Sequence, residues 1–140
     1  MLQKSINYFY NHKLMVHKFI YIAIAGAVGS LCRYGFTSIV HKFFSFTYPW
    51  GTLFVNLSGC LLAGAMFTLF DEYIQVSSQL RIAMFIGFLG AFTTFSTFIL
   101  ETIQLLRSSE YLLALINIFV HNILGLMFFI IGIVLIKILY

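Results

Sequence analysis

The chain has 140 residues, enough for one domain, but its composition excludes an ordinary soluble one. Hydrophobic residues make up 61% of it and charged residues 9%, whereas soluble domains carry about 25% charged residues. The bilayer is therefore the expected solvent, with membrane lipid as a partner. The net charge of +4 comes from lysines and arginines that are scattered singly, so we expect no nucleic-acid partner.

Four predominantly apolar stretches are long enough, at about 20 residues each, to cross a hydrocarbon core as helices. They are Phe19–Val40, Trp50–Phe70, Ile82–Leu106 and Tyr111–Ile136. The sequence thus predicts an all-α membrane protein. Residues 1–15 lack a strong periodicity and are expected to form an N-terminal extension to a four-helix transmembrane domain at 16–140, with Met15 as a candidate translation start.

Four spans place both chain termini on one side of the membrane. That side receives five lysines and arginines and the other side three, a small bias under the positive-inside rule. Insertion in both orientations is therefore expected.

The first span contains AGAVGSLCRYG at residues 25–35. Gly26, Ser30 and Arg33 share one face of a helix, because they are spaced by four and three residues. Two interpretations are open. The face is either a close-packed seam with a snorkelling arginine, or it presents a fixed charge that concentrates an anion.

The second span contains WGTLFVNLSGCLLAG at residues 50–64. Its Asn56 amide has two N–H donors that are costly to leave unpaired in lipid. The amide either makes a structural hydrogen bond between helices or points into a pore. Cys32 and Cys60 have no metal-ligand spacing and are expected to be small buried apolar residues.

The third span contains GFLGAFTTFSTFILE at residues 87–101. Gly87, Gly90 and the hydroxyl-rich TTFST stretch lower its helix propensity, which predicts a break near the middle of this helix. Backbone carbonyls released at such a break can coordinate a cation.

Beyond the predicted break, Phe95 and Phe98 share a helical face. A pair at this spacing is often ordinary core, but aromatic rings have positive edges that attract an anion. Ser96 and Thr97 can supply O–H donors beside the rings, and Glu101 is the only acid within a predicted span.

The fourth span carries Asn117, His121 and Gly125 at intervals of four residues, which form a polar and small stripe on one helical face. His121 is interpreted either as a satisfied histidine between helices or as a proton-handling residue.

The stretches AGAVGSLCRYG, GTLFVNLSG and GFLGAFTTFSTF resemble, in order, the three signature blocks of the CrcB/Fluc fluoride channel family. The resemblance covers about residues 16–137. It implies a passive fluoride-selective channel that exports fluoride from the cytoplasm across the cell membrane. It also implies an antiparallel, dual-topology homodimer with two pores and a structural sodium ion at its centre.

The resemblance also implies roles for individual residues. Main-chain carbonyls of Gly90 and Thr93 would hold sodium, and ring edges of Phe95 and Phe98 would bind the anion. The remaining implied positions of the anion pathway are Asn56, Ser96, Thr97, Arg33 and Glu101. Ala25, Ser30 and His121 depart from the family pattern, His121 standing where a small hydroxyl residue is expected.

A small proton-coupled four-helix exporter is the alternative function. Such exporters depend on a glutamate in the first span, which has none here, so Glu101 or His121 would have to replace it. A structural membrane subunit is a second alternative, although a break-prone helix suits packing poorly. The chain is not expected to be an enzyme, because it has no paired carboxylates and no nucleophile with a base.

Overall fold

The structure, a computed structural model, describes residues 2–44 and 47–140, with side chains described from residue 15 onward. Its elements are α1 (Leu2–Phe43), α2 (Trp50–Thr68), the π-helical segment η1 (Leu69–Tyr73), α3 (Ser78–Ile82), the π-helical segment η2 (Ala83–Leu89), α4 (Gly90–Phe92), α5 (Phe95–Arg107) and α6 (Tyr111–Leu139). The described part of the chain is thus all-helical, as predicted.

Among the described residues, four stretches are long and apolar enough to cross a membrane: Met15–Phe43, Trp50–Tyr73, Ser78–Arg107 and Tyr111–Leu139. Each contains one of the four predicted spans, which confirms their number and order. Helix α1 continues without interruption from Leu2 through residue 15. No helix therefore ends at the expected boundary between the N-terminal extension and the transmembrane domain, because α1 passes through it.

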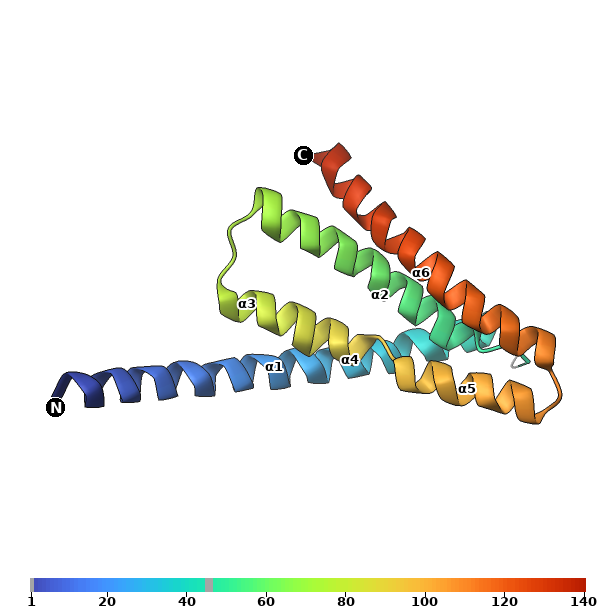
Figure 1. The fold of residues 1–140 in the computed structure, drawn as a ribbon, viewed down its shortest axis with the longest axis horizontal. Coiled ribbons are helices and arrows are strands. Elements are labelled where there is room, and N and C mark those ends of the chain that lie inside the picture. The colour runs from blue at the N-terminus through green and yellow to red at the C-terminus, as the bar shows by residue number, and fades with distance from the viewer. Residues whose placement is uncertain (1, 45–46) are drawn as a thin grey trace.

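Helices α2 and α6 lie side by side in the bundle (Figure 1). Glycines bring their backbones close together: a Cβ atom at Gly64 would lie 2.0 Å from the carbonyl oxygen of Phe129. One at Gly132 would lie 2.2 Å from the carbonyl oxygen of Leu61. Close backbone approach of this kind is how helices associate in lipid, where no hydrophobic force drives them together.

The third span packs against α1 (Figure 1). A Cβ atom at Gly29 would lie 2.3 Å from the carbonyl oxygen of Phe88, and one at Gly87 would lie 2.8 Å from the Cβ atom of Ala25. The seam is therefore centred on Gly29 and Ala25. The predicted face through Gly26 and Ser30 is displaced by about one residue, and Ser30 is exposed.

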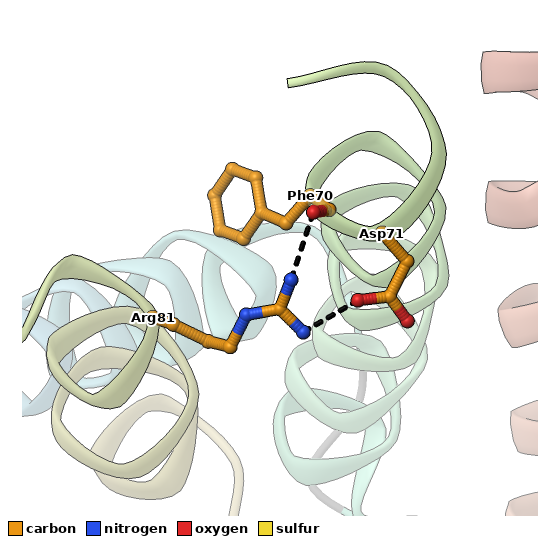
Figure 2. Close-up of polar contacts among 3 residues, drawn as sticks. All are labelled: Phe70, Asp71 and Arg81. Atoms are coloured by element: carbon orange, nitrogen blue, oxygen red, sulfur yellow. Dashed lines mark hydrogen bonds and ion pairs between the residues drawn. The ribbon is translucent and has the colours of Figure 1, made fainter. Parts of the chain in front are cut away.

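The turn between the second and third spans is held by Arg81 (Figure 2). Its guanidinium forms an ion pair with Asp71 and donates a hydrogen bond of 2.8 Å to the carbonyl oxygen of Phe70. Lys137 near the end of α6 pairs with Glu72 at 3.0 Å. These exposed ion pairs contribute little to stability.

Candidate functional site

The third span is broken at Thr93 and Thr94, which confirms the predicted break. Both residues have extended backbones, with φ −80° and ψ 161° at Thr93 and φ −150° and ψ 110° at Thr94. The new half-helix α5 is capped at its start, since the Thr94 hydroxyl accepts a 3.3 Å hydrogen bond from the N–H of Thr97. Threonine is a favoured cap because its oxygen satisfies an N–H group that has no helical partner.

Asn56 on α2 holds the broken segment by both ends of its amide. Its Oδ1 accepts a 2.8 Å hydrogen bond from the N–H of Thr94, and its Nδ2 donates to the Thr94 carbonyl oxygen at 3.1 Å. Gly59 permits this approach, because a Cβ atom there would lie 2.2 Å from Thr93 Cγ2. The amide thus replaces the helical hydrogen bonds that the break removes.

The break also releases two carbonyl groups from the helical ladder. In an unbroken helix the carbonyl of Gly90 would accept from the N–H of Thr94. That of Thr93 would accept from the N–H of Thr97. These N–H groups instead bond to Asn56 Oδ1 and the Thr94 hydroxyl. Gly90 is exposed, so the released segment lies at the surface of this chain.

Arg33 extends from α1 to the same segment. Its Nη1 donates to the carbonyl oxygen of Thr93 at 3.4 Å, and its side chain is half-buried. The arginine therefore places a positive charge next to the break.

A cavity of about 230 Å³ lies beside the break. Its lining consists of Asn56, Cys60, Thr93, Thr94, Phe95, Phe98, His121 and Asn122. The rings of Phe95 and Phe98 lie 5.5 Å apart between centroids at an interplanar angle of 52°. Phe98 is 4% exposed, whereas Phe95 is 73% exposed, so one ring belongs to the bundle and the other projects from it.

A second cavity, of about 410 Å³, lies one turn further along α5 and contains Glu101. The carboxylate accepts a 2.7 Å hydrogen bond from the Thr52 hydroxyl of α2. Tyr48, in the loop before α2, lines the same cavity. Burial raises the pKa of its hydroxyl, and the Glu101 carboxylate raises that pKa further, so Tyr48 stays a neutral O–H group at physiological pH.

The structure brings only some of the predicted anion-pathway residues to the first cavity. Asn56, Phe95 and Phe98 line it together, whereas Glu101 lines the second cavity. Ser96 and Thr97 lie in the capping network of Thr94: Thr97 Oγ1 accepts from the Thr94 hydroxyl at 2.9 Å, and Ser96 Oγ is 3.4 Å from it.

The sequence interpretation missed several residues of the site. Thr94 had a signal, because threonine is a favoured residue immediately before a helix. Thr52 stands four residues before Asn56 and so shares its helical face. Cys60 lines the first cavity, and Cys32 is exposed, so the expectation that both are simply buried is wrong.

The stripe on the fourth helix faces its neighbours. Asn117 is fully buried and donates a 2.9 Å hydrogen bond to the hydroxyl of Thr102 on α5. His121 has only one of its two ring nitrogens in such a contact among the described residues, because Nδ1 lies 3.0 Å from the carbonyl oxygen of Asn117 in its own helix. Its buried Nε2 has no hydrogen-bond partner among the described residues. The interpretation of His121 as a satisfied histidine between helices is therefore wrong.

Within the described residues, four apolar spans, a capped break in the third and a small cavity beside an aromatic pair define a helical membrane protein. The chain belongs to the CrcB family: residues 20–133 match the family described as "CrcB-like protein, Camphor Resistance (CrcB)". It is a multi-pass membrane protein.

The chain is also similar to curated proteins of several bacteria. A protein of Desulforapulum autotrophicum is 48% identical over 121 residues, which are 86% of this chain and 97% of that protein. One of Nitrosococcus oceani is 45% identical over 112 residues, 80% of this chain and 90% of its own. One of Salinibacter ruber is 43% identical over 115 residues, 82% of this chain and 86% of its own. Each of the three is named "Fluoride-specific ion channel FluC".

Proposed function

We propose that this chain is a fluoride-specific ion channel through which fluoride leaves the cytoplasm passively. It is not an enzyme. The assignment rests on relatives of that name that match most of this chain and most of their own length. The structural observation that best supports it is the first cavity, where a clamped helix break, an amide and a ring pair meet.

The cavity suits a small, strongly hydrated anion. Fluoride must exchange its water for other donors, and several weak donors let it enter without a deep trap. The Asn56 amide has two N–H groups, of which one donates to Thr94, so the other is left for the cavity. The edges of Phe95 and Phe98 add partial positive charge. We propose these groups as direct anion ligands.

The remaining predicted positions complete the proposed pathway. Arg33 beside the break raises the local concentration of an anion. Ser96 and Thr97 are proposed to supply hydroxyl groups along α5. Glu101, held by Thr52, lies in the second cavity, which we propose as an entrance to the pathway.

We further propose that two copies form an antiparallel homodimer with two pores. Phe95 is 73% exposed although it lines the first cavity, so a single chain leaves one wall of that cavity open. A second copy would cover it. The small charge bias between the two sides agrees with insertion in both orientations.

The released carbonyls of Gly90 and Thr93 fit a structural sodium ion between the two copies. Within the described residues no group of three or more histidines, cysteines and acids can hold a metal. A site made of carbonyl oxygens suits a hard cation and not a transition metal. The Thr93 oxygen has a second lone pair besides the one that faces Arg33.

The dimer and its cation are tested together by the mass of the purified protein in detergent. We expect a protein mass of twice 16.0 kDa by light scattering, and a shift toward one chain after prolonged exchange of sodium for a large organic cation. A single-chain mass in sodium would contradict the dimer. A dimer that is equally stable without sodium would contradict the sodium site.

The proposed function is tested by efflux from liposomes that contain the purified protein. We expect rapid passive loss of fluoride, measured with a fluoride electrode, and no loss of chloride from matched vesicles. Fluoride that accumulates against its own gradient when a pH gradient is imposed would favour the proton-coupled exporter. No fluoride efflux from a folded protein would contradict a channel.

A further inference from the structure

His121 beside the first cavity has one nitrogen in a hydrogen bond and one buried nitrogen without a hydrogen-bond partner among the described residues. A carbonyl oxygen can only accept, so the Nδ1 that faces the Asn117 carbonyl at 3.0 Å carries the proton in the neutral ring. Nε2 then bears a lone pair. This nitrogen is buried and has no hydrogen-bond partner among the described residues, and its side chain lines the cavity.

We propose that His121 is a fluoride ligand of this channel in its protonated form, so that a proton and a fluoride ion bind the first cavity together. The inference rests on the proposed function and concerns the same cavity. In the proposed site, the protonated His121 ring and fluoride form an ion pair, and Nε2–H donates a hydrogen bond to fluoride.

The two protonation states of His121 act oppositely on an anion. In the neutral ring Nε2 carries a lone pair, which repels an anion beside it. In the imidazolium both nitrogens donate, so Nδ1 keeps its bond to Asn117 while Nε2–H becomes a charge-assisted donor. No rotation of the ring is needed for this change.

The aromatic neighbour of His121 favours its charged form. The His121 and Phe98 rings lie 4.5 Å apart between centroids at 38°. A cation within about 6 Å of an aromatic centroid is attracted by the ring. The face of the Phe98 ring therefore favours the imidazolium, while its edge stays available to an anion.

Few other ionisable groups compete for this role among the described residues. Helices α2 and α5 pack against α6 here. From α2, the Cys60 thiol lines the same cavity. From α5, Glu101 is the ionisable residue nearest along the helix, but its carboxylate bonds to Thr52 and lines the second cavity. Asn122, next to His121, donates to the Ile118 carbonyl in its own helix.

Proton and fluoride binding at one site must reinforce each other by the same factor. Fluoride affinity therefore rises as the pH falls through the midpoint of the His121 titration. The midpoint rises in turn when fluoride is bound. The test therefore spans about pH 5 to 8, the range in which a histidine ordinarily changes charge.

The test measures how initial efflux depends on fluoride concentration at about pH 5.5 and about pH 8. We expect the half-saturating fluoride concentration of the wild type to be about tenfold lower at the acid pH, within the usual range of such couplings. HF crosses lipid unaided, so the rate from protein-free liposomes is subtracted at each pH. His121→Gln keeps a neutral N–H donor and should show no pH dependence.

The matched control is His17→Gln, which removes an exposed histidine of α1 that does not line this cavity. It should keep the pH dependence of the wild type. Equal half-saturation at both pH values, or a pH dependence that persists in His121→Gln, would overturn the inference while leaving the channel in place. Absence of fluoride efflux at every pH would instead overturn the proposed function.

A second measurement needs no change at His121. The chain has four histidines, so replacing His12, His17 and His41 with glutamine leaves one imidazole to follow by NMR. We expect saturating fluoride, but not chloride, to raise the midpoint of its titration by about one pH unit, the equivalent of tenfold coupling. An unchanged midpoint in fluoride would overturn the inference even if His121→Gln failed to fold.

Discussion

Fluoride efflux is expected to fall to the background of protein-free liposomes when Asn56 is replaced by aspartate. The carboxylate cannot donate to the Thr94 carbonyl and faces it with two acceptor oxygens. Leaving one buried acceptor unpaired costs about 1–3 kcal/mol, which alone corresponds to about fivefold to 150-fold in an equilibrium. The added negative charge in the first cavity repels the anion as well.

Two variants separate the contributions of the clamp and of the charge. Asn56→Ala removes the hydrogen bonds to Thr94 without adding charge. Asn122→Asp adds a charge to the same cavity without changing the clamp. Each should lower efflux less than Asn56→Asp does. Wild-type efflux from a folded, dimeric Asn56→Asp protein would contradict both the clamp and the position of the pathway.

Replacing Phe98 with isoleucine should lower fluoride efflux by at least about tenfold. Isoleucine keeps an apolar side chain at a position that is 4% exposed, but it has no positive ring edge. The change also removes the ring contacts with Phe95 and His121. Aromatic pairs contribute about 0.5–1.5 kcal/mol each beyond area burial, so losing two of them approaches or exceeds tenfold.

The matched control for Phe98→Ile is Phe67→Ile. Phe67 is 47% exposed on α2 and pairs with Phe129, away from both cavities. Its replacement removes a ring of the same kind and should leave efflux unchanged. Equal efflux from Phe98→Ile and wild-type liposomes, with equal amounts of folded protein, would contradict a role of the Phe98 ring in the fluoride pathway.

The sequence was sufficient for features that depend on local composition. A span is recognised because about 20 apolar residues in a row must cross the bilayer as a helix. The break in the third span was also predictable, since glycines and clustered hydroxyl residues weaken a helix there and threonine caps the next one. These properties belong to a short stretch of chain and do not depend on its neighbours.

Features that join distant parts of the chain were not predictable in detail. Asn56 and Thr94 are 38 residues apart, and Thr52 and Glu101 are 49 apart. The sequence marked Asn56 and Glu101 as polar groups that need partners in lipid, but many acceptors were available to each. The seam of α1 is centred on Ala25 and Gly29, one residue from the predicted Gly26 and Ser30, because a small rotation of a helix changes which residues meet its neighbour.

By itself, the sequence determined the four spans, the position of the break and the polar and aromatic residues that we propose for the fluoride pathway. Only the tertiary structure decided which of them meet. It brought Asn56 to the broken backbone, placed Phe98 inside the bundle with Phe95 outside it, and buried Nε2 of His121 without a partner among the described residues. The physical reason is that helix formation is local, whereas the rotation and close approach of packed helices depend on all their contacts together.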